Sequence, residues 1–193
     1  MTDDTDVSSP AKCRAPAATQ QTGRIRAFAP GDRDTVLAVN QANLPAVGSL
    51  TGAALDALVA QARATLVAEV DGRPAGLLIC LDHTARYDSP NFAWLKERLG
   101  RFTYVDRIAL APDACGLGIG QRLYETLIAR LAEDPATAGL PLACEVNTRP
   151  ANPGSLRFHR RLGFVEIGTL DHGDKAVVFL SRTADPASGE ASL

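Results

Sequence analysis

The chain has 193 residues, of which 46% are hydrophobic and 22% are charged, and its formal net charge at neutral pH is −2. This composition is typical of one globular domain with a buried core. The sequence pI of about 5.9 argues against nucleic acid as the main partner, because nucleic-acid-binding surfaces are usually basic. No apolar run approaches the length of a membrane-spanning helix, so we expect no membrane partner either.

Polar segments flank the central part of the chain. We expect disordered tails at residues 1–22 and 184–193, with a single domain at residues 23–183 between them. The acidic N-terminus lacks the apolar stretch of a signal peptide, which predicts a cytoplasmic protein. The four cysteines form no Cys-x-x-Cys pair and the three histidines are scattered, so the sequence predicts free thiols and no metal site.

The first half of the domain contains alternating strand and helix patterns. The Asp71-Gly72 pair separates two apolar runs and is typical of a tight β-hairpin turn. The expected elements are a strand at residues 24–28, a helical region up to Asn43, a helix at 50–61, and strands at 64–70 and 75–81.

A long connection at residues 82–102 follows the hairpin. Within it Ser89 is a typical N-cap, Pro90 suits the first helical position, and Phe92 and Leu95 share a helix face. The sequence leaves two interpretations open. The segment is either a helix that packs on the edge of the core or a lid over a binding site.

The most informative stretch begins where the next predicted strand, residues 104–110, ends. Residues 110–120 read Leu-Ala-Pro-Asp-Ala-Cys-Gly-Leu-Gly-Ile-Gly, and an amphipathic helix pattern follows at once. Glycines at such a turn let the backbone approach a ligand, and the helix N-terminus favours a phosphate group. Gln121 and Arg122 replace the Lys-Ser or Lys-Thr of a P-loop, and the spacing differs from the dinucleotide-binding fingerprint. A purely structural turn is the alternative.

A second strand and helix follow the first pair. Residues 142–147 form an apolar strand that contains one carboxylate, Glu145. Residues 152–164 have the pattern of a short helix that stops at Gly163. Strands at residues 165–170 and 176–180 complete the predicted domain.

Together these motifs resemble the GCN5-related N-acetyltransferase (GNAT) superfamily over about residues 22–182. In that family a strand runs into an (Arg/Gln)-x-x-Gly-x-Gly turn, and Asn-x-x-Ala-x-x-x-Tyr-x-x-x-Gly-Phe follows later. Two residues depart from the pattern, since Cys115 stands at the Arg/Gln position and His159 stands at the Tyr position. The matching residues are Leu110, Ala111, Pro112, Gly118, Ile119, Gly120, Asn152, Ser155, Gly163 and Phe164.

The resemblance implies an α/β fold, with a mixed central sheet of about six or seven strands flanked by helices on both faces. It also implies an N-acetyltransferase that moves an acetyl group from acetyl-CoA directly to a primary amine, on a small molecule or a protein N-terminus. A non-catalytic acyl-CoA-binding or sensor module is the alternative, and the sequence leaves open whether the chain forms a homodimer. The residues expected to bind acetyl-CoA are Ile108, Ala109, Leu110, Cys115, Gly116, Leu117, Gly118, Ile119, Gly120, Gln121, Asn152 and Ser155.

Direct acetyl transfer requires a base for the amine proton and an acid for the departing thiolate. Glu145 is the candidate base, because an unpaired carboxylate is costly in an apolar strand and several family members carry a catalytic Glu there. Its alternative role is an ion pair with Arg107 or Arg149. Asp106 is the second candidate base, although its neighbour Arg107 favours a local charge pair. His159 is the candidate acid by its position in the motif.

Overall fold

The computed structural model describes residues 23–183, so both predicted tails lie outside the described residues. Seven strands form one mixed sheet in the order β1-β2-β3-β4-β5-β7-β6, in which only the β4–β5 pair is parallel. This confirms the mixed sheet expected from the sequence. The strands are β1 (Arg24–Ala27), β2 (Ala64–Val70), β3 (Arg73–Asp82), β4 (Thr103–Leu110), β5 (Leu142–Arg149), β6 (Val165–Asp171) and β7 (Ala176–Arg182).

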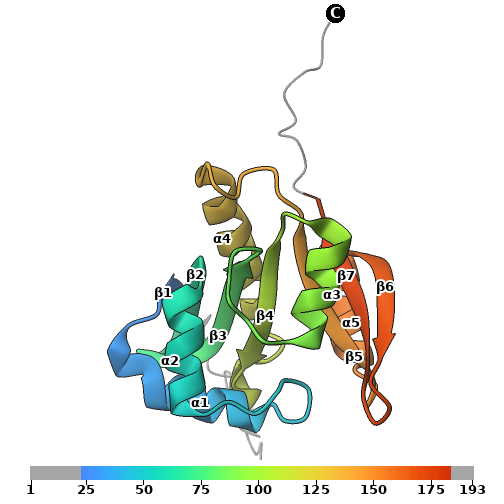
Figure 1. Cartoon of the computed structure of the whole chain (residues 1–193). Helices are drawn as coiled ribbons and strands as arrows, with labels where there is room; N and C mark the ends of the chain where they lie inside the picture. The colour runs from blue at the N-terminus through green and yellow to red at the C-terminus, as the bar shows by residue number, and fades with distance from the viewer. Residues whose placement is uncertain (1–22, 184–193) are drawn as a thin grey trace, which may run out of the picture.

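Helices cover both faces of the sheet, as expected (Figure 1). The first three helices pack on one face and the last two on the other, so the sheet separates two hydrophobic cores. The helices are α1 (Arg33–Ala42), α2 (Gly52–Gln61), α3 (Pro90–Leu99), α4 (Ile119–Glu133) and α5 (Pro153–Arg161). None of them is long and apolar enough to cross a membrane.

The local signals in the sequence act where they were expected. Asp71 and Gly72 both have positive φ, 50° and 75°, as the tight turn between β2 and β3 requires. Ser89 caps α3, since its Oγ accepts a hydrogen bond from the Phe92 N–H. Gly163, with φ of 82°, ends the α5 region in the left-handed conformation that glycine tolerates best.

Strands β4 and β5 pair over only two residues and then part. Their register joins Thr103 to Leu142 and Tyr104 to Ala143, although both strands continue well beyond this point. On its other side β4 pairs with β3 throughout, except for a bulge at Asp106, which is the extra residue between two paired positions. The result is an opening in the middle of the sheet.

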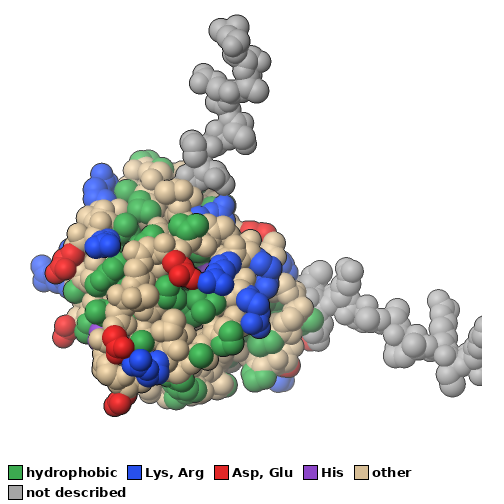
Figure 2. Space-filling model, turned by 90° about the vertical axis from the view of Figure 1, so that its right-hand side faces the viewer, with side chains coloured by type: hydrophobic (Ala, Val, Ile, Leu, Met, Phe, Trp, Pro, Cys, Tyr) green, Lys and Arg blue, Asp and Glu red, His purple; other side chains and the backbone are tan. Residues whose placement is uncertain are grey.

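Strand β6 forms one edge of the sheet, and Figure 2 shows the side of the molecule that carries it. Basic and acidic side chains are interspersed over this side, with apolar groups scattered between them. Two ion pairs involve residues of β6, Arg160 with Glu166 and Arg149 with Asp171. Charges at an edge strand oppose pairing with the strand of another chain.

Candidate functional site

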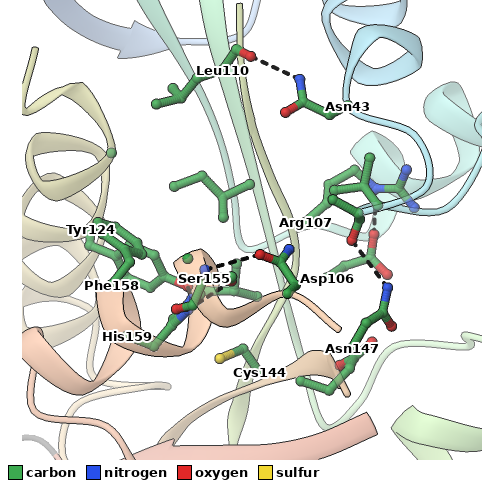
Figure 3. Close-up of a pocket in the computed structure, with 18 of the residues that line it drawn as sticks. Asn43, Asp106, Arg107, Leu110, Tyr124, Cys144, Asn147, Ser155, Phe158 and His159 are labelled. Atoms are coloured by element: carbon green, nitrogen blue, oxygen red, sulfur yellow. Dashed lines mark hydrogen bonds and ion pairs between the residues drawn. The ribbon is translucent and has the colours of Figure 1, made fainter. Parts of the chain in front are cut away.

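A cavity of about 1060 Å³ lies where β4 and β5 part. Its walls come from the glycine-rich turn before α4, the start of α5, the segment leading into α3, the loop at residues 43–48 and the β6–β7 loop. Figure 3 shows Tyr124, Phe158 and His159 on one side of this cavity and Asp106 and Arg107 on the other. The opening in the sheet therefore brings together segments from the whole length of the domain.

The glycine-rich turn presents backbone N–H groups at the N-terminus of α4. Gly116 and Gly118 have φ of 80° and 73°, a conformation that other residues rarely adopt. Within the described chain the N–H groups of residues 116–121 donate to no other group. Free N–H groups at a helix N-terminus bind anions, phosphate above all. Gly120 is needed for a different reason, because a Cβ there would lie 3.2 Å from the Phe158 ring.

The structure brings ten of the twelve expected cofactor residues to the cavity wall, all except Ala109 and Leu117. The side chain of Leu117 is exposed instead. Ala109 is buried on the α1–α3 face, because the bulge at Asp106 reverses the direction of every later side chain in β4. The same reversal turns Ile108 and Leu110 toward the face covered by α4. Sequence alternation alone did not reveal this bulge.

Glu145 lies on the cavity wall with one carboxylate oxygen occupied and the other without a partner. Oε1 accepts hydrogen bonds from the Tyr104 hydroxyl (3.0 Å) and the Asn91 amide (3.1 Å). Oε2 is buried and accepts no hydrogen bond in the described chain. Burial raises the pKa of Glu145 to about 7, although the two hydrogen bonds act in the opposite direction. A carboxyl group with this pKa exchanges protons readily near neutral pH.

The two arginines that were alternative partners of Glu145 are engaged elsewhere. Arg149 pairs with Asp171. Arg107 is buried, pairs through Nε with Asp106 Oδ2 (2.6 Å), and donates to the Asn40 side chain (2.9 Å). Asp106 is therefore held in the local charge pair that its sequence neighbour suggested. Glu145 is the carboxylate at this site that lacks a cationic partner.

His159 is buried, with 3% of its surface exposed, and both ring nitrogens are hydrogen-bonded. Nδ1 lies 2.8 Å from the Ser155 carbonyl oxygen and Nε2 lies 2.8 Å from the Tyr124 hydroxyl. A carbonyl oxygen only accepts, so this geometry assigns the proton to Nδ1, and Nε2 accepts from Tyr124. Burial lowers the pKa of His159, which favours this neutral form. The transferable proton of the pair is on the Tyr124 hydroxyl.

Asn152 and Ser155, the other residues of the later motif, shape the start of α5. The Asn152 side chain caps the helix by accepting from the Ser155 N–H (3.1 Å). A further amide on the opposite wall, Asn43, donates to the Leu110 carbonyl oxygen (2.8 Å) and ties the loop after α1 to the end of β4. These contacts fix the position of both walls before any ligand enters.

Sequence reasoning missed the side chains that surround the two candidate catalytic residues. Tyr124 reads as a core residue of an amphipathic helix, and Tyr104 reads as an apolar strand residue. Asn91 follows the N-cap of α3 and carries no signal of its own. The partners of these side chains are distant along the chain, so no local pattern in the sequence joins them.

Glu145 and the Tyr124–His159 pair lie on opposite faces of the sheet. Glu145 has the same strand orientation as Ala143, which packs with α1–α3, whereas Tyr124 belongs to the core under α4 and α5. The gap between β4 and β5 joins the two faces. The site therefore has a carboxylate oxygen that can accept a proton at one end, a hydroxyl that can donate one at the other, and a turn of free N–H groups beside that hydroxyl.

Comparison with known proteins adds independent findings. A family model described as "Acetyltransferase (GNAT) family" matches residues 32–164. The phosphinothricin N-acetyltransferase of Alcaligenes faecalis is 37% identical over 105 residues, which is 54% of this chain and 46% of that protein. The chain thus spans about half the length of this curated relative.

Solved structures share the fold over nearly their whole length. Ard1 from Thermoplasma volcanium has a TM-score of 0.67 and 21% identity, covering 83% of this chain and 97% of that one. The ribosomal-protein-S18-alanine N-acetyltransferase from Escherichia coli has a TM-score of 0.63 and 16% identity, covering 89% and 99%. The protein yncA from Salmonella typhimurium, solved with acetyl-CoA, has a TM-score of 0.61 and 18% identity, covering 89% and 99%. At these identities the likeness establishes the fold alone.

Proposed function

The chain belongs to the acetyltransferase (GNAT) family, and from this premise we propose that it transfers the acetyl group of acetyl-CoA directly to a primary amine. One observation carries the proposal. Glu145, a buried carboxylate with an unpartnered oxygen, shares a cavity with a glycine-rich turn whose free N–H groups suit a phosphate.

Acetyl-CoA enters from the face covered by α4 and α5. The free N–H groups of residues 116–121 hold its pyrophosphate, and Arg161 on the same wall supplies a positive charge for the nucleotide phosphates. The pantetheine arm follows the exposed edge of β4, from Leu110 toward the gap, and the thioester lies between the two faces of the sheet. Cys115 lines the cavity without an adjacent base, so it has no nucleophilic role in this scheme.

The amine enters from the face that carries Glu145. A free alkylamine has a pKa of about 10, so it must lose a proton before its nitrogen attacks. That proton passes to Glu145 Oε2, directly or through a water molecule, because Oε2 is the oxygen that lacks a donor. The nitrogen then bonds to the acetyl carbon, the carbon–sulfur bond breaks, and the electron pair of that bond leaves with the sulfur. The nitrogen releases its second proton to water as the amide forms.

The departing thiolate takes its proton from the Tyr124–His159 pair. The Tyr124 hydroxyl donates to His159 Nε2 before the reaction, and it turns to the sulfur and gives up this proton as the thiolate leaves. Water then returns a proton to the Tyr124 oxygen. The sequence assigned the acid to His159 by its motif position. We now assign the acid to Tyr124, and His159 is the residue that holds the Tyr124 hydroxyl in place.

The experiment that tests this function measures CoA release from acetyl-CoA in the presence of a panel of amines. Phosphinothricin heads the panel because it gives the curated relative its name, followed by amino acids, small polyamines and peptides with free N-termini. We expect amine-dependent CoA release in the wild type, and a strong loss of release in Glu145→Gln while acetyl-CoA still raises the melting temperature.

The same experiment separates the alternative, a non-catalytic acyl-CoA-binding module. Such a module also gains thermal stability from acetyl-CoA, because the ligand binds only the folded state. It acetylates no amine in the panel. Stabilisation of the wild type without amine-dependent CoA release therefore contradicts the proposed transferase.

A further inference from the structure

The inserted helix α3 reaches the carboxylate that the proposed function uses as the base. Asn91, in the first turn of α3, donates from Nδ2 to Glu145 Oε1 at 3.1 Å. The other end of the same amide, Oδ1, lies 3.0 Å from Nε2 of His172 in the β6–β7 loop. An amide oxygen only accepts and a carboxylate only accepts, so both contacts agree on one orientation of the amide.

Packing against the sheet fixes the position of α3. Trp94 stacks flat on Phe179, with ring centroids 4.0 Å apart and an angle of 4° between the planes. Phe179 is the register partner of Glu145 on β7, and Trp94 lies three residues after Asn91 on the same helix face. Gly168 of β6 lies directly under the Trp94 ring, and any larger residue would collide with it, since a Cβ there would lie 2.6 Å from the indole. The indole is thus anchored over Phe179, the residue that pairs with Glu145 in the sheet.

We propose that Asn91 is a positioning residue for the base, which together with Tyr104 holds Oε1 of Glu145 and leaves Oε2 as the oxygen that receives the amine proton. The segment at residues 82–102 is then a working part of the active site as well as a part of the core. This inference rests on the proposed function only for the identity of Glu145 as the base.

The amide of Asn91 acts by stabilising the ionised form of Glu145. A donor to a carboxylate favours the charged state, so Asn91 lowers the pKa of Glu145 against the effect of burial. The amide itself does not titrate, and the titratable side chain at its other end is His172 in the β6–β7 loop. The titratable groups that interact with Glu145 from the surrounding elements are Tyr104 and Asp106 on β4, Tyr87 before α3, Tyr124 on α4 and Cys144 on β5.

A direct test follows the titration of Glu145 by carbon-13 NMR of its side-chain carboxyl group, assigned by its absence in Glu145→Gln. We expect Asn91→Leu to raise the pKa of Glu145 by about one unit, because a hydrogen bond to the charged form is lost. Asn91→Asp has the same shape and adds a like charge, so it raises the pKa further. Asn147→Leu is the matched control, since the Asn147 amide lies on the same cavity but contacts the Pro45 and Ala46 carbonyl groups.

The second readout is the pH dependence of kcat/KM with phosphinothricin, or with the first amine of the panel that is acetylated. We expect Asn91→Leu to be about fivefold slower near pH 7, where less Glu145 is ionised, and equal to the wild type near pH 9. A folded Asn91→Leu protein with an unchanged Glu145 pKa overturns the proposal, as does an equal loss of rate at every pH. If the wild type acetylates no amine, the proposed function fails, and the NMR titration still decides the role of Asn91.

Discussion

Replacing Glu145 with glutamine should remove a pH-dependent part of the protein's stability together with the base. The pKa of Glu145 is raised from an ordinary value of 4.5 to about 7 in the folded protein, mainly by burial. The folded state therefore holds this proton more tightly than the unfolded chain does. The corresponding stability is fully present below pH 4.5 and is lost as the pH rises through 7.

The size of the effect follows from this shift. One pKa unit corresponds to about 1.4 kcal/mol, so the free energy of unfolding of the wild type should fall by about 2.5 kcal/mol between about pH 5 and about pH 8 through Glu145 alone. Glutamine does not titrate and still accepts hydrogen bonds from Tyr104 and Asn91 through its carbonyl oxygen. Any cost of its unpaired amide N–H is the same at both pH values, so that cost cancels from the difference.

Urea unfolding of both proteins at these two pH values measures the effect. We expect the difference in the free energy of unfolding, variant minus wild type, to increase by about 2.5 kcal/mol from the lower to the higher pH. Groups elsewhere in the chain titrate equally in both proteins and drop out of the comparison. Parallel pH dependence of the two proteins would show that Glu145 titrates normally and would refute the assignment of a buried, neutral carboxyl group at low pH.

Three further substitutions test other parts of the site. Gly118→Val should cost about 1–2 kcal/mol of stability, because valine is strained in the left-handed backbone conformation of Gly118. It should also weaken acetyl-CoA binding measured by calorimetry, and an unchanged affinity would place the cofactor elsewhere. Tyr124→Phe should lower kcat by about 100-fold or more because the acid is lost, and near-normal turnover would remove Tyr124 from the mechanism. The same change should destabilise the fold by about 1–3 kcal/mol because His159 Nε2 loses its hydrogen-bond donor. Gly168→Val should displace Trp94 and reproduce the pH–rate change of Asn91→Leu, and an unchanged profile in the folded variant would show that this packing does not position α3.

Local sequence signals predicted the elements of the fold well. The Asp71-Gly72 turn, the Ser89 cap and the glycine-rich turn all depend on the backbone preferences of adjacent residues, which are readable from the sequence. The bulge at Asp106 was not predictable in this way. It depends on how β3 and β4 align, and it decides that Ala109 faces the core while Ile108 and Leu110 face the cavity.

The candidate site was predictable in its residues and not in their partners. The lone carboxylate in an apolar strand identified Glu145, because an uncompensated charge there needs a reason. Its donors come from Asn91 and Tyr104, which lie 54 and 41 positions away, and no local pattern joins them. In the same way His159 was visible as a motif position, whereas its contact with Tyr124 depends on the packing of α5 against α4.

The pH dependence of kcat/KM for amine acetylation, compared between the wild type and Glu145→Gln, tests the central claim most directly. We predict that the wild-type rate rises through an acid limb with a pKa of about 7. In Glu145→Gln this limb should be absent and the rate near neutral pH should be lower by about 10²–10⁴-fold, with the gap narrowing as the amine loses its own proton near pH 10. The same acid limb and similar rates in both proteins would contradict the assignment of Glu145 as the base of direct acetyl transfer.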